Sequence, residues 1–578
     1  MEKRVLLAVI LSFIVLVGSQ VLFPPPKPPA FETTPPAATS TGSATPATSA
    51  ATAPATPGAD PAVQIPAAIE PPRATVAAAQ DQDIVVDGPA VSAVFSTRGA
   101  TLKSWRLKSY RDDRGEPLEL VPTAVPNPVR PFTLSVDDPV VSAALRGALF
   151  KPSANSLTIA GPSTLTFEYR DEAGLTATKQ FSFAPERPYE IGFAVRVSRN
   201  GAPLRPTIDL GPSIGTGVIG GGMTYNPPPQ PVFYRSGEVT RLGIEDIAER
   251  RAEEGDFNFA GVDDHYFLNA AVDARSARVE YRPVRVSVAG SDKGLQFIDW
   301  SIRYPEGVTE SRFFLGPKDF DVLRAISPEM TYGIDFGMFR WLVVPLLNAL
   351  KWVNGYVGNY GWSIIALTVL INLVMFPLRH KSVVSMRRMQ AIQPEVKAIQ
   401  DRYAKLKMTD PARQKMNVEL MNLYRERGVN PASGCVPMLL TFPVLFAFYA
   451  MLSVAIEIRG APFVGWIKDL AAHDPLFIWP VVMGVTMVIQ QKMTPTAMTD
   501  PLQARMMTLM PIVFSVMLAW APSGLVLYWT ASNIWTIGQQ AVTNKLIGPP
   551  PAHTVRPPAE RRVKSAGSGK SAQAKERG

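Results

Sequence analysis

The residues with the clearest chemical potential are polar side chains inside otherwise apolar segments of this 578-residue sequence. They recur at intervals of three or four, which places them on one face of an α-helix. Three segments are therefore predicted to be helices with one polar face each. The polar residues are Thr368 and Asn372 in the first segment, Thr486 and Gln490 in the second, and Trp529, Asn533, Thr536 and Gln540 in the third.

Two interpretations of these polar faces remain open. Hydrogen bonds between membrane helices would use the same residue types, at about 0.6 kcal/mol per contact. The alternative is a hydrated cavity, because an unpaired polar group facing lipid costs several kcal/mol. Three polar faces in one sequence favour the cavity.

Two motifs that would indicate an enzyme fail in their context. Gly211-Pro212-Ser213-Ile214-Gly215 matches the GxSxG elbow of hydrolases, with Asp264 and His265 downstream. That elbow needs a helix after the serine, but residues 216–229 are rich in glycine and proline. Residues 567–571 imitate the end of a P-loop, yet its first glycine is replaced by Lys564 and no strand precedes it. We therefore expect no enzymatic activity.

Metal and cofactor chemistry has little support. The sequence contains one cysteine and four scattered histidines, too few for a structural zinc or haem site. Cys435 is expected to be a small buried packing residue, with no disulfide partner. The expected set of cofactors and metals is empty.

The elements that position these residues belong to a membrane protein with a divided charge. Charged residues make up 19% of the chain, below the roughly 25% of soluble proteins. Residues 24–331 hold 30 Lys/Arg and 36 Asp/Glu, and the remainder holds 28 and 13. The net charges are thus −6 and +15, which suggests basic cytoplasmic loops rather than a surface for nucleic acid.

The N-terminal part predicts an anchor and a tether. Residues 1–23 carry an apolar run behind Lys3 and Arg4, read as a signal anchor, with a cleaved signal peptide as the alternative. Residues 24–80 are rich in proline, alanine and threonine, and we expect a disordered linker.

Residues 81–331 predict an antiparallel β-sandwich on the far side of the membrane. Apolar residues alternate with other residues from Tyr189 to Ser198, as in a strand with one solvated face. Similar runs flank the turn at residues 171–174 and indicate a hairpin. Residues 332–361 then change to helical spacing and are rich in tryptophan and tyrosine, which predicts an interfacial amphipathic helix.

Residues 362–545 predict five further membrane spans, several of them short against the ~20 residues that a bilayer requires. A basic helical hairpin at 379–434 and a basic tail at 546–578 are expected in the cytoplasm. The hairpin either sets topology only or docks ribosomal RNA or acidic partners. Methionines crowd the last third of the chain, as in ordinary apolar packing or a surface that accepts varied apolar segments. The spans are 362–378, 435–456, 476–491, 506–521 and 524–543.

Motifs in this region resemble those of the YidC membrane protein insertases, relatives of the mitochondrial Oxa and chloroplast Alb proteins. The resemblance is specific over about 330–545 and weaker over 84–330. The matching stretches are Asn430-Pro431 through Gly434-Cys435-Val436-Pro437, Phe442-Pro443, Tyr449-Ala450-Met451-Leu452, Gln491-Lys492-Met493-Thr494-Pro495, and Pro522-Ser523-Gly524-Leu525-Val526-Leu527-Tyr528-Trp529.

The resemblance implies an insertase with six transmembrane helices, a periplasmic β-sandwich and five core helices around a hydrophilic groove. It further implies location in the bacterial inner membrane, with both termini cytoplasmic and residues 24–361 periplasmic. Nascent membrane proteins, the ribosome and the Sec translocon would be its partners, in contact with the lipid bilayer. The signal recognition particle receptor is a further candidate, whereas DNA is not, and no nucleotide is hydrolysed.

The resemblance also bears on single residues. Thr368 and Trp529 match substrate-contacting groove positions, whereas Asn372 stands where many family members have arginine or lysine. Arg379 lies seven residues further on, about 10 Å along a helix, and is a candidate cation at the groove mouth. The expected groove residues are Thr368, Asn372, Gln490, Trp529, Asn533 and Gln540.

Two other function classes stay open from sequence alone. A transporter or channel would show paired intramembrane charges or inverted repeats, and neither is evident. An envelope scaffold would act through the β domain and use its helices only as an anchor. Insertion activity after deletion of residues 84–330 would separate the scaffold from the groove.

Overall fold

The computed structural model describes residues 73–112, 114–122, 125, 128–212, 228–288, 291–305, 310–403, 412–429, 436–493 and 501–547. The predicted signal anchor, most of the linker, nearly all of the basic tail and Cys435 lie outside these residues. The linker prediction ran to residue 80, but β1 (Ala74–Val76) already pairs with the sheet of the following domain.

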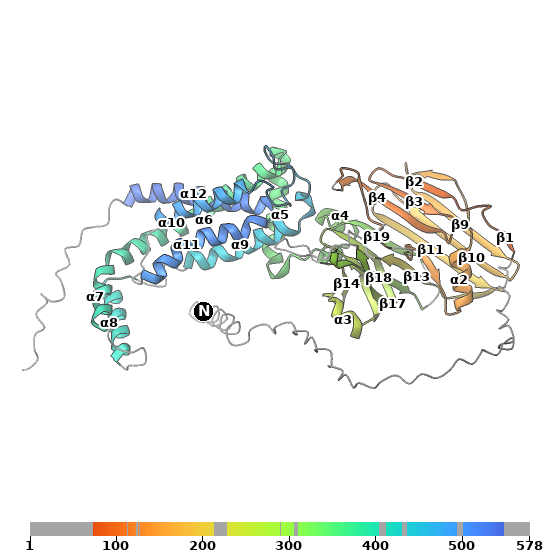
Figure 1. Cartoon of the computed structure of the whole chain (residues 1–578), viewed down its shortest axis with the longest axis horizontal. Coiled ribbons are helices and arrows are strands. Elements are labelled where there is room, and N and C mark those ends of the chain that lie inside the picture. The colour runs from red at the N-terminus through yellow and green to blue at the C-terminus, as the bar shows by residue number, and fades with distance from the viewer. Residues whose placement is uncertain are drawn as a thin grey trace, which may run out of the picture. The chain divides into compact units, whose positions relative to one another are not determined.

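The β domain contains two sheets (Figure 1). Within the described residues, the larger sheet has 14 strands, nine of them in the order β1-β9-β10-β11-β19-β17-β16-β14-β15. The remaining strands of this sheet are β6 (Thr133–Ser135), β7 (Lys151–Pro152), β12 (Ala202–Leu204), β13 (Thr207–Pro212) and β18 (Ser291–Arg303). The main path comprises β9 (Ser163–Asp171), β10 (Leu175–Phe183), β11 (Glu190–Arg199), β14 (Gln230–Arg235), β15 (Glu238–Arg241), β16 (Ala252–Asp263), β17 (Phe267–Val288) and β19 (Ser311–Pro317).

The smaller sheet has the order β5-β4-β3-β2-β8. Its β2 and β8 run parallel, whereas the sequence predicted antiparallel pairing throughout. The difference arises because a parallel pair joins segments far apart in the chain, and no local turn signals it. The strands are β2 (Asp83–Asp87), β3 (Val91–Ser96), β4 (Thr101–Arg111), β5 (Pro117–Glu119) and β8 (Ser156–Thr158).

The two sheets share one apolar core, as expected for a β-sandwich. Phe95 of the smaller sheet packs on Phe181 of the larger one, with ring centroids 4.6 Å apart. The Trp105 indole of β4 donates a 2.9 Å hydrogen bond to the Leu315 carbonyl oxygen of β19. The prediction of a large β domain is thereby confirmed.

Short helices complete the β domain and lead out of it. The helix α2 (Pro139–Gly147) begins at the N-cap Asp138, whose carboxylate accepts from two backbone N–H groups. The others are α3 (Ile244–Glu249), α4 (Phe320–Ile326) and the 3₁₀ turns η1 (Pro328–Gly333) and η2 (Gly337–Phe339).

The helix α5 (Arg340–Val357) occupies the predicted interfacial segment. Its buried residues Val343, Leu346, Leu347 and Leu350 form one stripe. Trp341, Trp352 and Tyr356 are exposed, as aromatic residues of a membrane interface are. This division between two faces is that of an amphipathic helix.

Five longer helices follow in the region of the predicted spans. Judged by length and apolar composition alone, α6 (Tyr360–Ala391) is the only helix among the described residues that could cross a membrane. It continues through Pro377 well beyond the predicted end at residue 378. The others are α9 (Val436–Val454), α10 (Ile478–Met493), α11 (Pro501–Met517) continued by η5 (Leu518–Trp520), and α12 (Ser523–Ile547), with η4 (Ile456–Ile458) after α9.

The predicted hairpin consists of the end of α6, then α7 (Gln393–Tyr403) and α8 (Ala412–Glu426). A small separate core holds α7 and α8 together. Gly428, with φ +60°, follows α8 in a left-handed conformation that ends a helix at low cost. The core residues are Ile392, Val396, Ile399, Leu423 and Val429.

Candidate functional site

A groove of about 830 Å³, lined by both polar and apolar side chains, lies among the helices in the described part of the chain. The helices α6, α9, α10, α11 and α12 that build it lie side by side (Figure 1). Of its twenty lining residues, eight are polar or charged without an aromatic ring. These are Arg379, Ser382, Gln490, Ser532, Asn533, Thr536, Gln539 and Gln540.

Most of the polar lining comes from one helix. On α12, Trp529, Asn533, Thr536 and Gln540 follow each other at three- or four-residue spacing, so that they form a stripe along the groove. We call these four residues the α12 stripe. The Asn533 amide donates a 3.2 Å hydrogen bond to the Thr486 hydroxyl of α10. The stripe therefore both lines the groove and ties α12 to α10.

Arg379 is the only charged residue among the lining residues described. Its guanidinium donates a 3.1 Å hydrogen bond to the Thr536 hydroxyl. That hydroxyl in turn donates to the Ser532 carbonyl oxygen at 2.8 Å. A cation on α6 is thus held against the α12 stripe by a neutral partner, which leaves its charge uncompensated by any acidic residue of the lining.

The helices α9 and α11 supply an apolar side to the same groove. Phe442 and Phe446 of α9 stack with ring centroids 6.1 Å apart. Phe514 of α11 packs on Trp529, with centroids at 4.7 Å. Met487 and Met510 also line the groove, whereas Met483 is fully buried elsewhere. The groove therefore offers flexible and aromatic apolar contacts next to amides and hydroxyls.

The structure brings Gln490, Trp529, Asn533 and Gln540 together with Arg379 in this groove. Thr368 and Asn372 are not among its lining residues. Both are buried and bonded within their own helix. The Thr368 hydroxyl donates to the Ile364 carbonyl oxygen at 2.6 Å, and the Asn372 amide donates to the Thr368 carbonyl oxygen at 2.8 Å.

Three of the polar lining residues, Ser382, Ser532 and Gln539, were named nowhere in the sequence analysis. Ser532 and Gln539 each precede a member of the α12 stripe by one position, so they widen its polar face. Ser382 follows Arg379 by three residues on α6. Extending each polar face by neighbouring positions would have found all three, since small polar residues in a helix of this kind stand out from their apolar surroundings.

The hydrolase-like residues are engaged elsewhere. The Asp264 carboxylate accepts hydrogen bonds from the backbone N–H groups of Tyr266 and Phe267. Burial raises the pKa of Asp264 to about 6. Burial also lowers the pKa of His265 to about 4, and its Nε2 atom lies 2.6 Å from the Ser453 carbonyl oxygen. Ser213 lies outside the described residues.

Comparisons with known proteins agree with this architecture. Residues 352–549 match the family described as 60Kd inner membrane protein, and residues 83–349 match the YidC periplasmic domain. The chain is 36% identical to the membrane protein insertase YidC of Geobacter metallireducens over 573 residues, covering 95% of this chain and 99% of the relative. The YidC of Geobacter sulfurreducens is also 36% identical, over 561 residues, with the same coverage.

Solved structures were compared as well. A crystal structure of an active YidC insertase with its first transmembrane domain resolved is 18% identical. The match covers 82% of this chain and 95% of that one, with a TM-score of 0.33.

Proposed function

The chain belongs to the YidC family of membrane protein insertases, and from this premise we propose that the groove beside the α12 stripe is its path for client segments. The protein is an insertase of the bacterial inner membrane with a periplasmic domain, and not an enzyme. Membership sets aside the transporter and scaffold interpretations as the main function. The observation that carries the proposal is a groove between apolar helices that is lined by the polar α12 stripe and by Arg379 of α6.

The stripe lowers the cost of moving a hydrophilic tail across the bilayer. A charged residue at the centre of a membrane helix costs about 2.5–3.5 kcal/mol on insertion scales. Amides and hydroxyls of the α12 stripe, together with water that they hold, replace hydrocarbon along part of the path. The apolar segment of the client then leaves sideways into lipid, where burial of apolar area drives it.

Arg379 supplies the positive charge of the groove in this chain. At the position where many relatives carry a cation, Asn372 offers only an amide, which is directed to its own helix. Arg379 is held at the α12 stripe through Thr536 and faces the groove without an acidic partner in the lining. It attracts the acidic residues of a translocating tail, a role that Asn372 does not fill.

The topology that we propose has six transmembrane helices: the signal anchor and five core helices that contain α6, α9, α10, α11 and α12. The basic segment around α7 and α8 faces the cytoplasm, as the positive-inside rule requires. There it meets the ribosome that delivers the client. The Sec translocon and the signal recognition particle receptor are further proposed partners. The chain inserts clients either alone or beside the translocon.

Photo-crosslinking of an arrested nascent chain tests the path. A crosslinking amino acid at Gln490, Asn533 or Gln540 should label the nascent segment. Leu373 and Val374 of α6 are matched control positions, since both are strongly exposed outside the groove lining. Labelling confined to the two control positions would contradict the proposed path, and equal labelling everywhere would mean that the groove has no preference for the client.

A further inference from the structure

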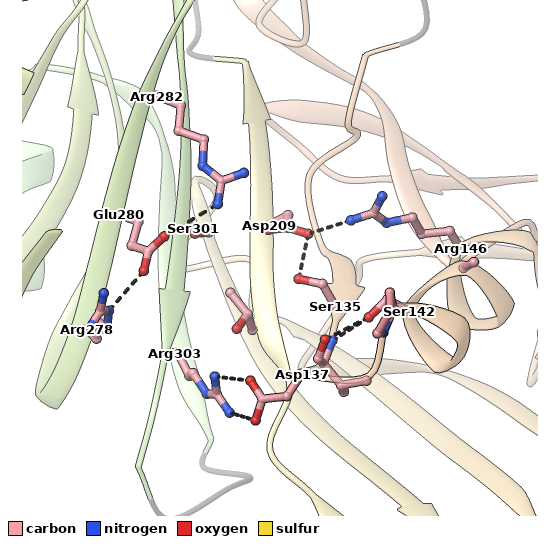
Figure 2. A pocket seen from close by; sticks show the side chains of 14 residues that line it. Ser135, Asp137, Ser142, Arg146, Asp209, Arg278, Glu280, Arg282, Ser301 and Arg303 are labelled. Atoms are coloured by element: carbon pink, nitrogen blue, oxygen red, sulfur yellow. Dashed lines mark hydrogen bonds and ion pairs between the residues drawn. The ribbon is translucent and has the colours of Figure 1, made fainter. Parts of the chain in front are cut away.

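A second cavity lies in the β domain, far in sequence from the helices of the groove. Its volume is about 560 Å³, and its wall comes from β6, β13, β17, β18 and α2. The strand register brings polar residues into rows across one face of the sheet. Glu280 pairs with Ser301, and Ser301 pairs with Asp209. Figure 2 shows these side chains directed toward the same space. We call it the β-domain cavity.

Four arginines line this cavity, together with the acidic residues Asp137, Asp209 and Glu280. Arg278 of β17 stands directly opposite Arg303 of β18 in the register. Like charges at such a position destabilise a sheet unless each has another partner. Arg303 is held by a bidentate pair of 2.7 Å bonds to Asp137, and Arg278 donates to Glu280 at 2.9 Å. Two arginines are therefore fixed by the domain itself.

The other two arginines are loosely held. The guanidinium of Arg146, on the last turn of α2, approaches the Asp209 carboxylate only at 3.9 Å, beyond hydrogen-bonding distance. Arg282 of β17 reaches Glu280 at 3.4 Å, near the limit of a hydrogen bond. Their side chains are 53% and 72% exposed. Both guanidinium groups therefore have donors available to a ligand.

Arg146 and Arg282 also share a smaller recess of about 60 Å³ that adjoins the cavity. Ser301 and Asp209 line both spaces as well. In Figure 2 the two arginines lie on opposite sides of Asp209. Two fork-shaped donors from different elements, together with the Ser301 hydroxyl that lines the same recess, form a site that no single element supplies.

We propose that the β-domain cavity binds a phosphate ester, with its phosphate between Arg146 and Arg282 and its organic part in the larger space. A carboxylate is planar and is satisfied by one guanidinium fork. A phosphate carries several acceptor oxygens and accepts from two forks and the Ser301 hydroxyl at once. The cavity volume lies in the range of small-molecule sites, well beyond the size of a bare anion.

The carboxylates of the site are compatible with an anionic ligand because most have closer partners. Asp137 is paired with Arg303, and Glu280 with Arg278. Asp209 accepts a 3.0 Å hydrogen bond from the Ser135 hydroxyl, and burial raises its pKa. Asp299, at the recess, is the remaining acidic neighbour, facing Arg282 across the strand register.

Titration calorimetry with the full-length chain in a neutral maltoside detergent tests the proposal. The probe is glycerol 3-phosphate, and glycerol is the control for its organic part. Arg146→Gln and Arg282→Gln should each weaken binding about tenfold, the loss of one charged hydrogen bond. The matched control is Arg196→Gln, an exposed arginine of β11 outside the cavity, which should leave binding unchanged. Thermal unfolding of each variant verifies that the domain remains folded.

Three outcomes would overturn the proposal: no binding by the unmodified chain, equal heats for glycerol and its phosphate, or unchanged binding in a folded variant that combines Arg146→Gln with Arg282→Gln. The source of the phosphate is settled by repeating the titration in nanodiscs that contain phosphatidylglycerol. Weakened binding of the soluble probe there would identify a lipid headgroup as the occupant. Unchanged binding would identify a soluble phosphate ester, and both results keep the site.

Discussion

Replacing Arg379 with methionine removes the only charge among the groove residues described while keeping a long apolar side chain. The variant should insert clients with acidic translocated tails more slowly and leave clients with neutral tails unaffected. The physical reason is that Arg379 has only the neutral Thr536 hydroxyl as its hydrogen-bond partner in the groove. Its charge is therefore available to an acidic residue that passes along the α12 stripe.

The size of the effect follows from the surroundings of the guanidinium. Two unit charges 4 Å apart attract by about 4 kcal/mol at an effective dielectric constant near 20, and by about 1 kcal/mol in bulk water. The groove is lined by both amides and aromatic rings, so an intermediate environment applies. A loss of about 1–2 kcal/mol per acidic residue corresponds to a rate about five- to thirtyfold lower.

The assay is insertion of purified client into liposomes that contain the reconstituted chain, followed by protease protection of the translocated tail. Lys381→Met is the matched control, because Lys381 lies on the same helix but outside the groove lining. Thr536→Val removes the hydroxyl that accepts a hydrogen bond from Arg379, and it should produce a smaller defect of the same kind. Equal slowing of acidic and neutral clients by Arg379→Met, or equal defects in the control, would refute the electrostatic reasoning.

Three further predictions concern the β domain, each measured by urea unfolding. Lys318→Met should cost about 3–5 kcal/mol, because it removes the nearer cationic partner of the buried Asp263 carboxylate, at 3.1 Å, and leaves only Arg241 at 3.8 Å; a cost below about 1 kcal/mol would contradict this. Burial raises the pKa of Asp299 to about 6, so its carboxyl takes up a proton on folding between about pH 4 and 6. Stability from this group is present at low pH and is lost as the pH rises through 6. Asp299→Asn should remove this part of the pH dependence, whereas the part from Asp264, whose pKa burial also raises to about 6, remains. Gly261→Ala would place a Cβ atom 2.0 Å from a backbone carbonyl oxygen and should destabilise by about 3 kcal/mol, whereas Gly161→Ala, with open space around it, should not.

Local periodicity predicted much of the fold. The alternation from Tyr189 to Ser198 corresponds to β11, and the expected hairpin is β9 and β10 in continuous register. The parallel pair of β2 and β8 was missed because it depends on a contact between distant segments. The length of α6 was missed because the predicted span ended with the apolar run at residue 378, whereas the helix continues past Arg379 to Ala391.

The lining residues of the candidate site were predictable where a single helix supplies them. They were not predictable where contacts between distant segments determine which side chains face the groove. The spacing on α12 indicated a polar stripe, and four of its positions line the groove. The same spacing on α6 suggested Thr368 and Asn372, but polar side chains in a helix also bond the carbonyl oxygen four residues earlier, as both do here. Spacing alone does not distinguish these two outcomes. The apolar side from α9 and α11 depends on packing between distant segments.

The unequal composition of the groove walls has a mechanistic consequence. One helix, α12, contributes most of the amides and hydroxyls, while α9 and α11 contribute aromatic and aliphatic side chains. A client carries the same two chemistries, a hydrophilic tail and an apolar segment, and on the proposed path we expect each to be stabilised by a different wall. A groove polar on all sides would stabilise the hydrophilic tail. It would offer the apolar segment no favourable contacts in place of those with lipid. Because Phe442 and Phe446 lie on the same wall as each other, that wall accepts apolar segments by shape-tolerant ring contacts rather than by sequence. On the proposed path, we therefore expect the groove to contact both the hydrophilic tail and the apolar segment of a client, and to leave the apolar segment free to move into the bilayer.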